Sequence, residues 1–198
     1  MLGENRALAG SYETTLELAR GSRRVLYGII GAGVFAGLTF VGANIYVPLI
    51  PVPITMQTLF VLLGGAVLGG RCGSLGQFFY VGAGAIGLPV FATHVGGLGI
   101  LTGPTGGYLY SFLVAPLVVA ALLRRSGSIA WQVGVFTAGT FVIFAFGVAH
   151  LAVFYTHDLA AALRVGALPF IPGAVFKIAA AVSIYRSYSA LRRRTLRD

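Results

Sequence analysis

Residues 168–188 read LPFIPGAVFKIAAAVSIYRSY. From Phe170 to Ser183 the only charged residue is Lys177, and most of the others are apolar. About 20 apolar residues are enough for a helix to cross the hydrocarbon core of a bilayer. The stretch therefore predicts a transmembrane helix that carries an ionisable side chain within it.

Further apolar segments precede this one, at about residues 25–44, 54–69, 74–91, 106–123 and 129–155. The chain of 198 residues is 57% hydrophobic and only 10% charged, whereas an ordinary soluble domain has about 25% charged residues. This composition excludes a soluble globular enzyme and a disordered chain, because too few polar residues are present to cover a surface. We predict an all-α, polytopic membrane protein with six transmembrane helices.

The basic residues are divided unequally between the two sides of these segments. One side has Arg164 alone, and the other side has Arg6, Arg20, Arg23, Arg24, Arg71, Arg124, Arg125, Arg186, Arg192, Arg193, Arg194 and Arg197. Because the cytoplasmic loops of membrane proteins are enriched in Lys and Arg, we expect both termini in the cytoplasm.

The expected domain organisation follows from this topology. Residues 1–24 form a cytoplasmic N-terminal segment, residues 25–188 a six-helix transmembrane domain that would hold a substrate, and residues 189–198 a basic cytoplasmic tail. The N-terminal segment lacks the apolar core of a signal peptide, so no cleavage is expected. Its helical spacing fits either a short amphipathic helix on the membrane surface or a frayed tail, through Leu8, Tyr12, Leu16 and Ala19.

Lys177 is the only lysine in the chain, and an ionised lysine near the middle of a membrane costs about 2.5 kcal/mol or more on insertion scales. The acidic residues all lie outside the six segments, at Glu4, Glu13, Glu17, Asp158 and Asp198. We therefore expect Lys177 to lack a counter-ion within the protein, and an anionic ligand such as a carboxylate would supply one. Snorkelling of the side chain to the membrane surface is the alternative.

Two long apolar connections lie on the side that has few basic residues. Residues 47–53 are rich in proline, which prevents a regular helix, and residues 93–107 are rich in glycine. Apolar loops of this length are rarely plain linkers, so we expect both to fold back over the helices and close a site. The glycine-rich stretch lacks the Lys-Ser/Thr pair of a phosphate loop, which argues against nucleotide binding. The connections on the other side are short, at residues 70–73 and 124–128.

Polar residues gather near the same ends of the segments as these loops, and each of them can line a site or bond between helices: Asn44, Thr55, Gln57, Gln77, Tyr80, Thr93, His94 and Tyr108. The first segment adds two small-residue pairs, Ala32 with Ala36 and Gly33 with Gly37, that allow a neighbouring helix of this chain or of a partner to approach closely.

Other kinds of site have little support in the sequence. The three histidines are scattered and Cys72 is the single cysteine, so neither a metal site nor a disulfide is expected. No Ser/His/Asp or paired-carboxylate arrangement is placed for catalysis. We expect no enzyme activity, no cofactor and no nucleic acid partner.

Four motifs occur in order along the chain: VPITMQTL at residues 52–59, GAIGLPVFA at 84–92, GPTGGY at 103–108 and LPFIPG at 168–173. Together they resemble the BioY family, the biotin-specific substrate-binding subunits of energy-coupling-factor (ECF) transporters. The resemblance covers about residues 25–188 and implies a six-helix protein of the bacterial inner (plasma) membrane that takes up biotin. It implies partnership with a transmembrane coupling protein and two cytoplasmic ATPase subunits.

The resemblance also assigns roles to residues of this sequence. The lysine of the last helix, which pairs with the biotin carboxylate in that family, corresponds to Lys177, and Ala32 and Ala36 match the Ala-x-x-x-Ala motif that contacts the coupling protein. Two positions depart from the family pattern. Ala174 stands where the family usually has the Asp of PGDxxK, and Thr93-His94 stand where it tends to have Asn; both family residues contact the ureido ring.

The candidate substrate-binding residues are therefore Lys177, Thr93, His94, Gly97, Gln57, Tyr108 and Ala174. Capture of biotin from the outer side is the first hypothesis. Because of the two departures, the same fold with a different small carboxylate ligand, such as another vitamin or a biotin analogue, is a second. A membrane scaffold without a transport role is a third.

Overall fold

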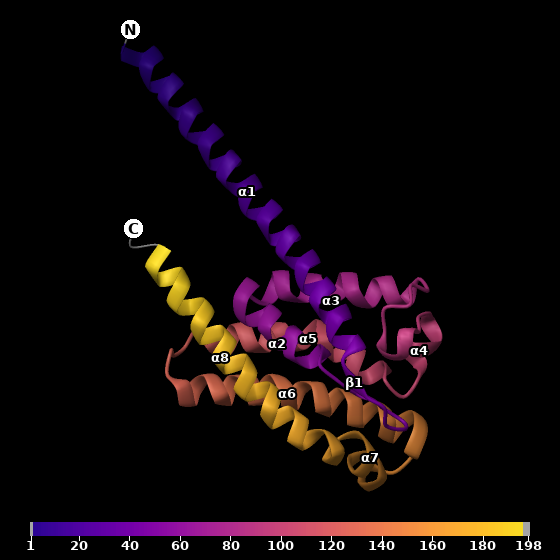
Figure 1. Cartoon of the computed structure of the whole chain (residues 1–198). Helices are drawn as coiled ribbons and strands as arrows, with labels where there is room; N and C mark the ends of the chain where they lie inside the picture. Colours follow the sequence, from indigo (N-terminus) through magenta and orange to yellow (C-terminus); the bar gives the residue numbers. More distant parts are fainter. Residues whose placement is uncertain (1, 196–198) are drawn as a thin grey trace.

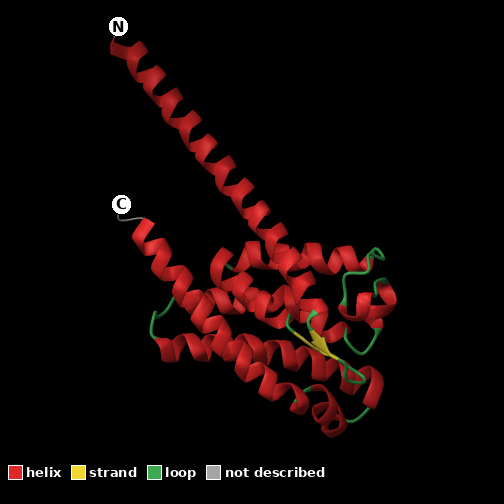
Figure 2. Ribbon diagram, viewed as in Figure 1, coloured by secondary structure: helices red, strands yellow, loops and turns green. Residues whose placement is uncertain are grey.

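A computed structural model of the chain describes residues 2–195, and the side chains of residues 22, 23 and 25–195. Helices make up nearly all of it (Figures 1 and 2): α1 (Leu2–Asn44), α2 (Gln57–Leu68), α3 (Gly70–Ala85), α4 (Leu98–Thr102), α5 (Gly106–Leu123), α6 (Ile129–Leu151), α7 (Leu159–Gly166) and α8 (Ile171–Thr195). Short helical turns are η1 (Ala92–His94), η2 (Ala152–Thr156) and η3 (Leu168–Phe170), and β1 (Tyr46–Val47) pairs antiparallel with β2 (Ile54–Thr55). The all-α prediction is confirmed.

Four stretches within the described part of the chain are long and apolar enough to cross a membrane: Val25–Asn44, Gly106–Leu123, Ile129–Thr156 and Leu159–Thr195. The predicted spans at 54–69 and 74–91 correspond to the shorter helices α2 and α3, which have 12 and 16 residues. At about 1.5 Å per residue these helices are about 18 and 24 Å long, less than the roughly 30 Å of a bilayer core. The count of six spans therefore stays a prediction.

The short helix α2 lies at the centre of the bundle. It contacts α1, α3, α5, α6 and α8, and its residues from Leu59 to Gly65 are mostly buried. A helix that is apolar on all sides belongs in such a surrounded position. Because other helices cover α2, it does not need the length of a helix whose sides face lipid.

Glycines allow the backbones of neighbouring helices to touch. A Cβ atom on Gly65 would lie 2.6 Å from the Cα and carbonyl oxygen of Pro116, across the α2–α5 contact. One on Gly76 would lie 2.7 Å from the carbonyl oxygen of Ala32, across the α1–α3 contact. Both glycines therefore permit the close helix packing that small residues allow in membrane proteins.

The small-residue pairs of α1 face different surroundings. Ala32 is fully buried against α3, and Ala36 is half-buried against the core. Within the chain, Ala32 packs against α3, and a role of Ala32 and Ala36 in a partner interface stays a prediction. Gly33 and Gly37 have no heavy atom within 4 Å of where a Cβ would be, so they form the open small-residue face of α1.

The connections on the arginine-rich side differ in part from the prediction. Residues 124–128 do connect α5 to α6, and the hydroxyl of Ser128 caps α6 by accepting from the backbone N–H of Trp131. The predicted connection at 70–73 is wrong: Gly69, with φ of 83°, alone separates α2 from α3. The positive φ of Gly69 turns the chain in one residue, so residues 70–73 form the first turn of α3.

The two ends of the chain are helical beyond the predicted spans. α1 runs without a break from Leu2, and α8 continues to Thr195, so neither residue 24 nor residue 188 marks a helix end. The side chains of the proposed amphipathic face lie outside the described residues: Leu8, Tyr12, Leu16 and Ala19.

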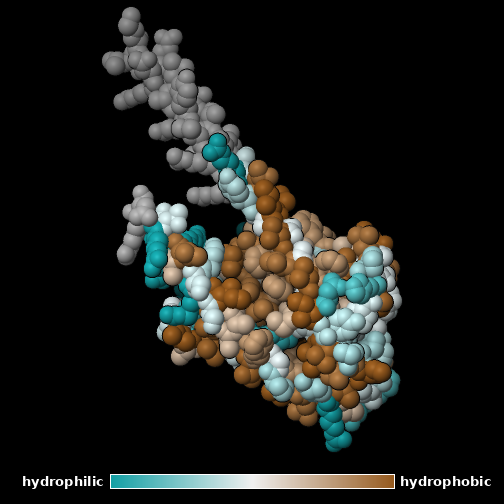
Figure 3. Space-filling model, in the orientation of Figure 1, coloured by the Kyte–Doolittle hydropathy of each residue, from teal (hydrophilic) through white to brown (hydrophobic). Residues whose placement is uncertain are grey.

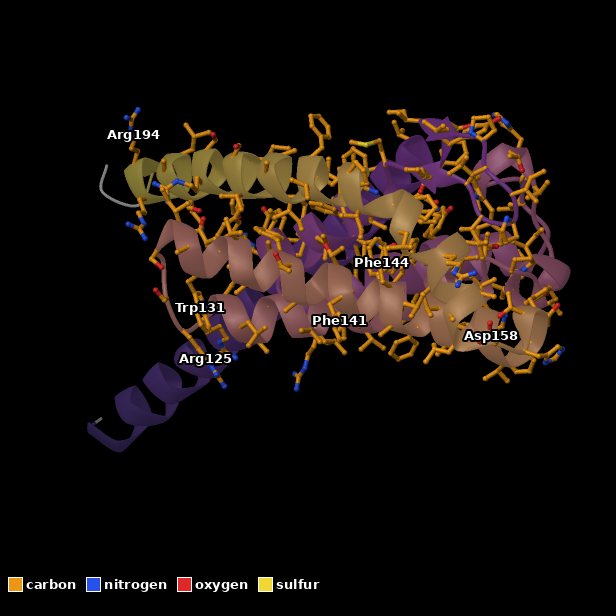
Figure 4. The ribbon with its side chains drawn as sticks, turned by 90° about the horizontal axis from the view of Figure 1, so that it is seen from below. Arg125, Trp131, Phe141, Phe144, Asp158 and Arg194 are labelled. Carbon is orange, nitrogen blue, oxygen red and sulfur yellow. The ribbon has the colours of Figure 1, made fainter. Side chains whose placement is uncertain are left out.

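Charge is segregated between the two ends of the bundle. Arg125, Trp131 and Arg194 lie at one end and Asp158 at the other (Figure 4). The connections around β1, α4 and α7 gather at the end that holds Asp158 (Figure 1). Apolar side chains cover much of the surface between (Figure 3), and Phe141 and Phe176 are well exposed there, as lipid-facing residues would be.

Candidate functional site

A cavity of about 700 Å³ opens at the loop end of the bundle, a volume typical of small-molecule sites. Both long apolar connections contribute to its wall, so the prediction that they fold over the helices is confirmed. The lining residues are Pro48, Leu49, Ile50, Pro51, Val52, Pro53, Thr55, Gln57, Thr58, Phe91, Ala92, Thr93, Val95, Ile100, Pro104, Thr105, Tyr108, Leu109, Phe112, Ile143, Phe144, Phe170 and Lys177.

Lys177 supplies the positive charge of this cavity. Its side chain projects from the second turn of α8 and is only 6% exposed. The ammonium Nζ donates a hydrogen bond to the backbone carbonyl of Thr55, at 2.9 Å. An ammonium group has three donors, so two remain for a ligand in the cavity.

No carboxylate among the described side chains contacts Lys177. Asp158, the acid at the same end of the bundle, instead caps the N-terminus of α7, where its oxygens accept from the backbone N–H groups of Ala160 and Ala161 at 3.0 and 3.1 Å. Capping of this kind satisfies helix donors. Among the described side chains, therefore, none supplies a counter-ion for Lys177.

A chain of hydrogen bonds positions the segment around Thr55, whose carbonyl accepts the hydrogen bond from Lys177. The Thr55 hydroxyl donates to Oε1 of Gln57 at 2.8 Å, and Nε2 of Gln57 donates to the Tyr80 hydroxyl at 2.5 Å. The Tyr80 hydroxyl in turn donates to the carbonyl of Val90 at 3.0 Å. These bonds tie β2, α2, α3 and the segment before η1 together, and they orient the Gln57 amide.

Aromatic rings form the apolar wall of the cavity. Tyr108 and Phe170 stack with their centroids 6.1 Å apart, and Phe144 meets Phe170 edge-on at 6.0 Å. The Tyr108 hydroxyl donates to the carbonyl of Gly166 at 2.6 Å, which holds α5 against the end of α7. A wall of this kind suits flat or aliphatic parts of a ligand and gives them large contact areas.

The structure brings together four of the predicted substrate-binding residues. Lys177, Gln57, Tyr108 and Thr93 all line the cavity. The other three, which are His94, Gly97 and Ala174, are not among its lining residues.

These three residues have other surroundings. His94 is exposed on η1. The N–H of Gly97 donates to the carbonyl of Gly84 at 2.7 Å, so its backbone joins the glycine-rich segment to α3. Ala174 is buried within α8, one turn before Lys177.

Thr93 and His94 have an unusual backbone conformation at the rim of the cavity. Their φ angles are 65° and 59°, in the left-handed region. That region costs an L-residue about 1–2 kcal/mol, and such strain is concentrated at functional sites. The Thr93 hydroxyl donates to the carbonyl of Ala92 at 2.5 Å, so it is bonded to its own loop.

Several apolar lining residues were not predicted as site residues, among them Phe91, Phe112, Ile143, Phe144 and Phe170. The chain has 14 phenylalanines, and a phenylalanine facing a cavity has the same spacing along a helix as one facing lipid. Phe91 and Phe170 had a signal, because they belong to the GAIGLPVFA and LPFIPG motifs.

Known proteins resemble the chain in sequence and in fold. The sequence model of the BioY family matches residues 15–194. A biotin transporter BioY of Thermotoga maritima is 44% identical over 156 residues, 79% of this chain and 92% of that protein. A probable biotin transporter BioY of Pyrococcus horikoshii is 42% identical over 150 residues, 76% of this chain and 88% of that protein.

A solved structure shares the fold. The crystal structure of the S-component for biotin from an ECF-type ABC transporter matches with a TM-score of 0.75, covering 87% of this chain and 93% of that one, at 24% sequence identity. The match along nearly the whole sequence and the shared fold agree with the resemblance in the four motifs. The chain belongs to the BioY family.

Proposed function

We propose that the chain is a multi-pass membrane protein that binds biotin in this cavity for uptake. The observation that carries the proposal is Lys177, a buried cation that lines the cavity and has no acidic partner among the described side chains. The biotin carboxylate would accept hydrogen bonds from its two remaining donors. Its fused rings would lie against Tyr108, Phe144 and Phe170. The names of the relatives support biotin as the ligand.

The polar edge of the biotin ureido group needs donors and acceptors. Thr58, Thr93 and Thr105 line the cavity, and their hydroxyls are candidates for this role. His94 and Gly97 would reach the ligand after a movement of the segment from η1 to α4. Ala174 cannot replace a carboxylate, and we propose that the ring is held without one.

We further propose that biotin enters from the outer side. The loops that line the cavity lie at the other end of the bundle from Arg125 and Arg194, which Figure 4 shows together. The positive-inside rule favours a cytoplasmic position for that arginine-rich end. Ile50 is 97% exposed at the cavity end, and Ser126 is exposed in the α5–α6 connection. In a Cys72→Ala background, an impermeant maleimide added to intact cells should label Ile50→Cys and not Ser126→Cys. The reverse pattern would overturn outer-side capture.

The energy for transport would come from partner subunits. Lys177 is the only lysine in the sequence and does not follow a glycine-rich phosphate loop. We propose a transmembrane coupling protein and two cytoplasmic ATPase subunits as the partners. The open face of α1 at Gly33 and Gly37, with the half-buried Ala36 beside it, would contact the coupling protein.

Titration of the purified protein with biotin in detergent tests the proposed function. Saturable binding of one biotin per chain is expected. A second candidate, a different carboxylate ligand, is favoured by Ala174 and Thr93 at the two departing positions. Competition with a biotin analogue that lacks the ureido oxygen separates the two. Absence of biotin binding, with function retained in Lys177→Met, would support the scaffold hypothesis instead.

A further inference from the structure

A second cavity, of about 570 Å³, lies at the arginine-rich end of the bundle. It is bounded by the α5–α6 connection on one side and by the last turns of α8 on the other. Four arginines line it: Arg124, Arg125, Arg186 and Arg193. No acidic side chain is among its lining residues, so the cavity concentrates positive charge without neutralising it.

A buried amide provides an independent sign of a missing ligand. Gln132 lines the same cavity and is only 5% exposed. Its Nε2 donates to the carbonyl of Gly127 at 3.1 Å, which fixes the orientation of the amide. Its Oε1 has no hydrogen-bond partner in the described structure. A buried acceptor without a donor is costly, so a ligand here should bring a donor as well as negative charge.

The surroundings favour a ligand that is partly in lipid. Both helices that border the cavity carry exposed apolar side chains near its lining residues in the sequence, Ile129 and Val133 on α6 and Ile184 and Leu191 on α8. Trp131 precedes Gln132 at the same end of the bundle as Arg125 (Figure 4), and its indole N–H donates to the carbonyl of Leu122 at 2.9 Å. Tryptophan is enriched at the depth of lipid headgroups. A soluble anion would gain nothing from these apolar neighbours.

We propose that this cavity binds the headgroup of phosphatidylglycerol. The phosphate would accept hydrogen bonds from the arginines, which match its geometry well. A glycerol hydroxyl would donate to Oε1 of Gln132. The acyl chains would lie along the exposed apolar faces of α6 and α8. The proposed lipid site is at the opposite end of the bundle from the cavity at Lys177, so it is separate from the proposed biotin site.

Native mass spectrometry of the full chain in detergent tests the proposal. The wild type should retain one phosphatidylglycerol and discriminate against phosphatidylcholine. Arg186→Gln with Arg193→Gln should weaken retention about 30-fold, since each arginine near an anionic headgroup contributes roughly one kcal/mol. The matched control, Arg192→Gln with Arg194→Gln, removes the same charge from residues that do not line the cavity. It should change retention less than about threefold, because exposed charges that make no direct contact with the phosphate contribute little.

Gln132→Met tests the role of the amide. It should lower retention of phosphatidylglycerol and leave retention of phosphatidic acid, which has no headgroup glycerol, unchanged. A thermal unfolding curve for each variant separates loss of the site from loss of the fold.

Three results would overturn the proposal. If both double substitutions weakened lipid retention equally, the lipid would be held by diffuse charge attraction and not by a defined site. Complete displacement of the lipid by an equal concentration of glycerol phosphate or inorganic phosphate would assign the cavity to a soluble anion. If the wild type retained no phosphatidylglycerol, the arginines would instead be assigned to binding an acidic segment of a partner protein.

Discussion

Replacement of Lys177 by methionine removes the charge from the cavity while keeping a side chain of similar length. Lys177 is 6% exposed, and its ammonium has two donors beyond the one that Thr55 accepts. A hydrogen bond to a charged group contributes about 1.5–3 kcal/mol. Two such bonds, less the desolvation of the ligand carboxylate, leave a net contribution of about 3 kcal/mol. The affinity for biotin should therefore fall about 100-fold.

The substitution also removes the bond to Thr55, which could loosen the proline-rich connection whatever the ligand. Biotinamide, which is neutral, separates the two effects. We expect the wild type to bind biotin about 100-fold more tightly than biotinamide and Lys177→Met to bind both within about threefold. Isothermal titration calorimetry of the four combinations gives the coupling between the lysine and the carboxylate.

The reasoning would be refuted if Lys177→Met lost the same affinity for biotin as for biotinamide. Lys177→Met would then act through the Thr55 carbonyl and the loop. The charge of Lys177 would have no part in recognition, and its burial would need another explanation.

Three further substitutions test other parts of the cavity. Thr93 has a φ of 65°, a conformation that asparagine tolerates better than threonine, so Thr93→Asn should raise the unfolding midpoint by about 2–4 °C in differential scanning calorimetry. The control Thr105→Asn, at a φ of −87°, should give no rise. An equal rise for the two variants would contradict the argument that the backbone at Thr93 is strained. Phe144→Ala should lower the affinity for biotin and for biotinamide alike, about tenfold in the same titration, because it removes part of the apolar wall. A loss of affinity for biotin alone would mean that the ring acts on the carboxylate end of the ligand. Tyr108→Phe should lower stability by about 1 kcal/mol through the lost bond to Gly166 and change biotin affinity less than threefold; a large loss of affinity with unchanged stability would make the hydroxyl a ligand contact.

The helices that face lipid could be predicted well from the sequence. α5 has the bounds that were predicted for it, and α6 with η2 ends one residue beyond the prediction. In both cases a continuous apolar run is bounded by arginine, glycine or polar residues. The α2–α3 junction was misplaced because Gly69, Gly70 and Gly73 are all able to turn the chain, and spacing alone does not say which one has the positive φ.

Which small-residue pair of α1 packs within the bundle could not be predicted for a related reason. Ala32 with Ala36 and Gly33 with Gly37 lie on adjacent faces of one helix, about 100° apart. Both pairs permit close packing, and only the position of α3 shows that it covers Ala32.

The polar part of the site could be predicted further than its apolar part. Lys177 is conspicuous in sequence because a charge within an apolar span demands an explanation. Gln57 and Tyr108 are polar residues beside loops of unusual composition. Phe144 carries no such mark, and it lines the cavity because α6 and α8 meet there in the fold.

A structure of the protein with biotin bound tests the central claim most directly. We predict a carboxylate oxygen of biotin within about 3 Å of Nζ of Lys177, with the fused rings against Tyr108, Phe144 and Phe170. A biotin whose carboxylate points away from Lys177, or one bound outside the cavity, would contradict the account.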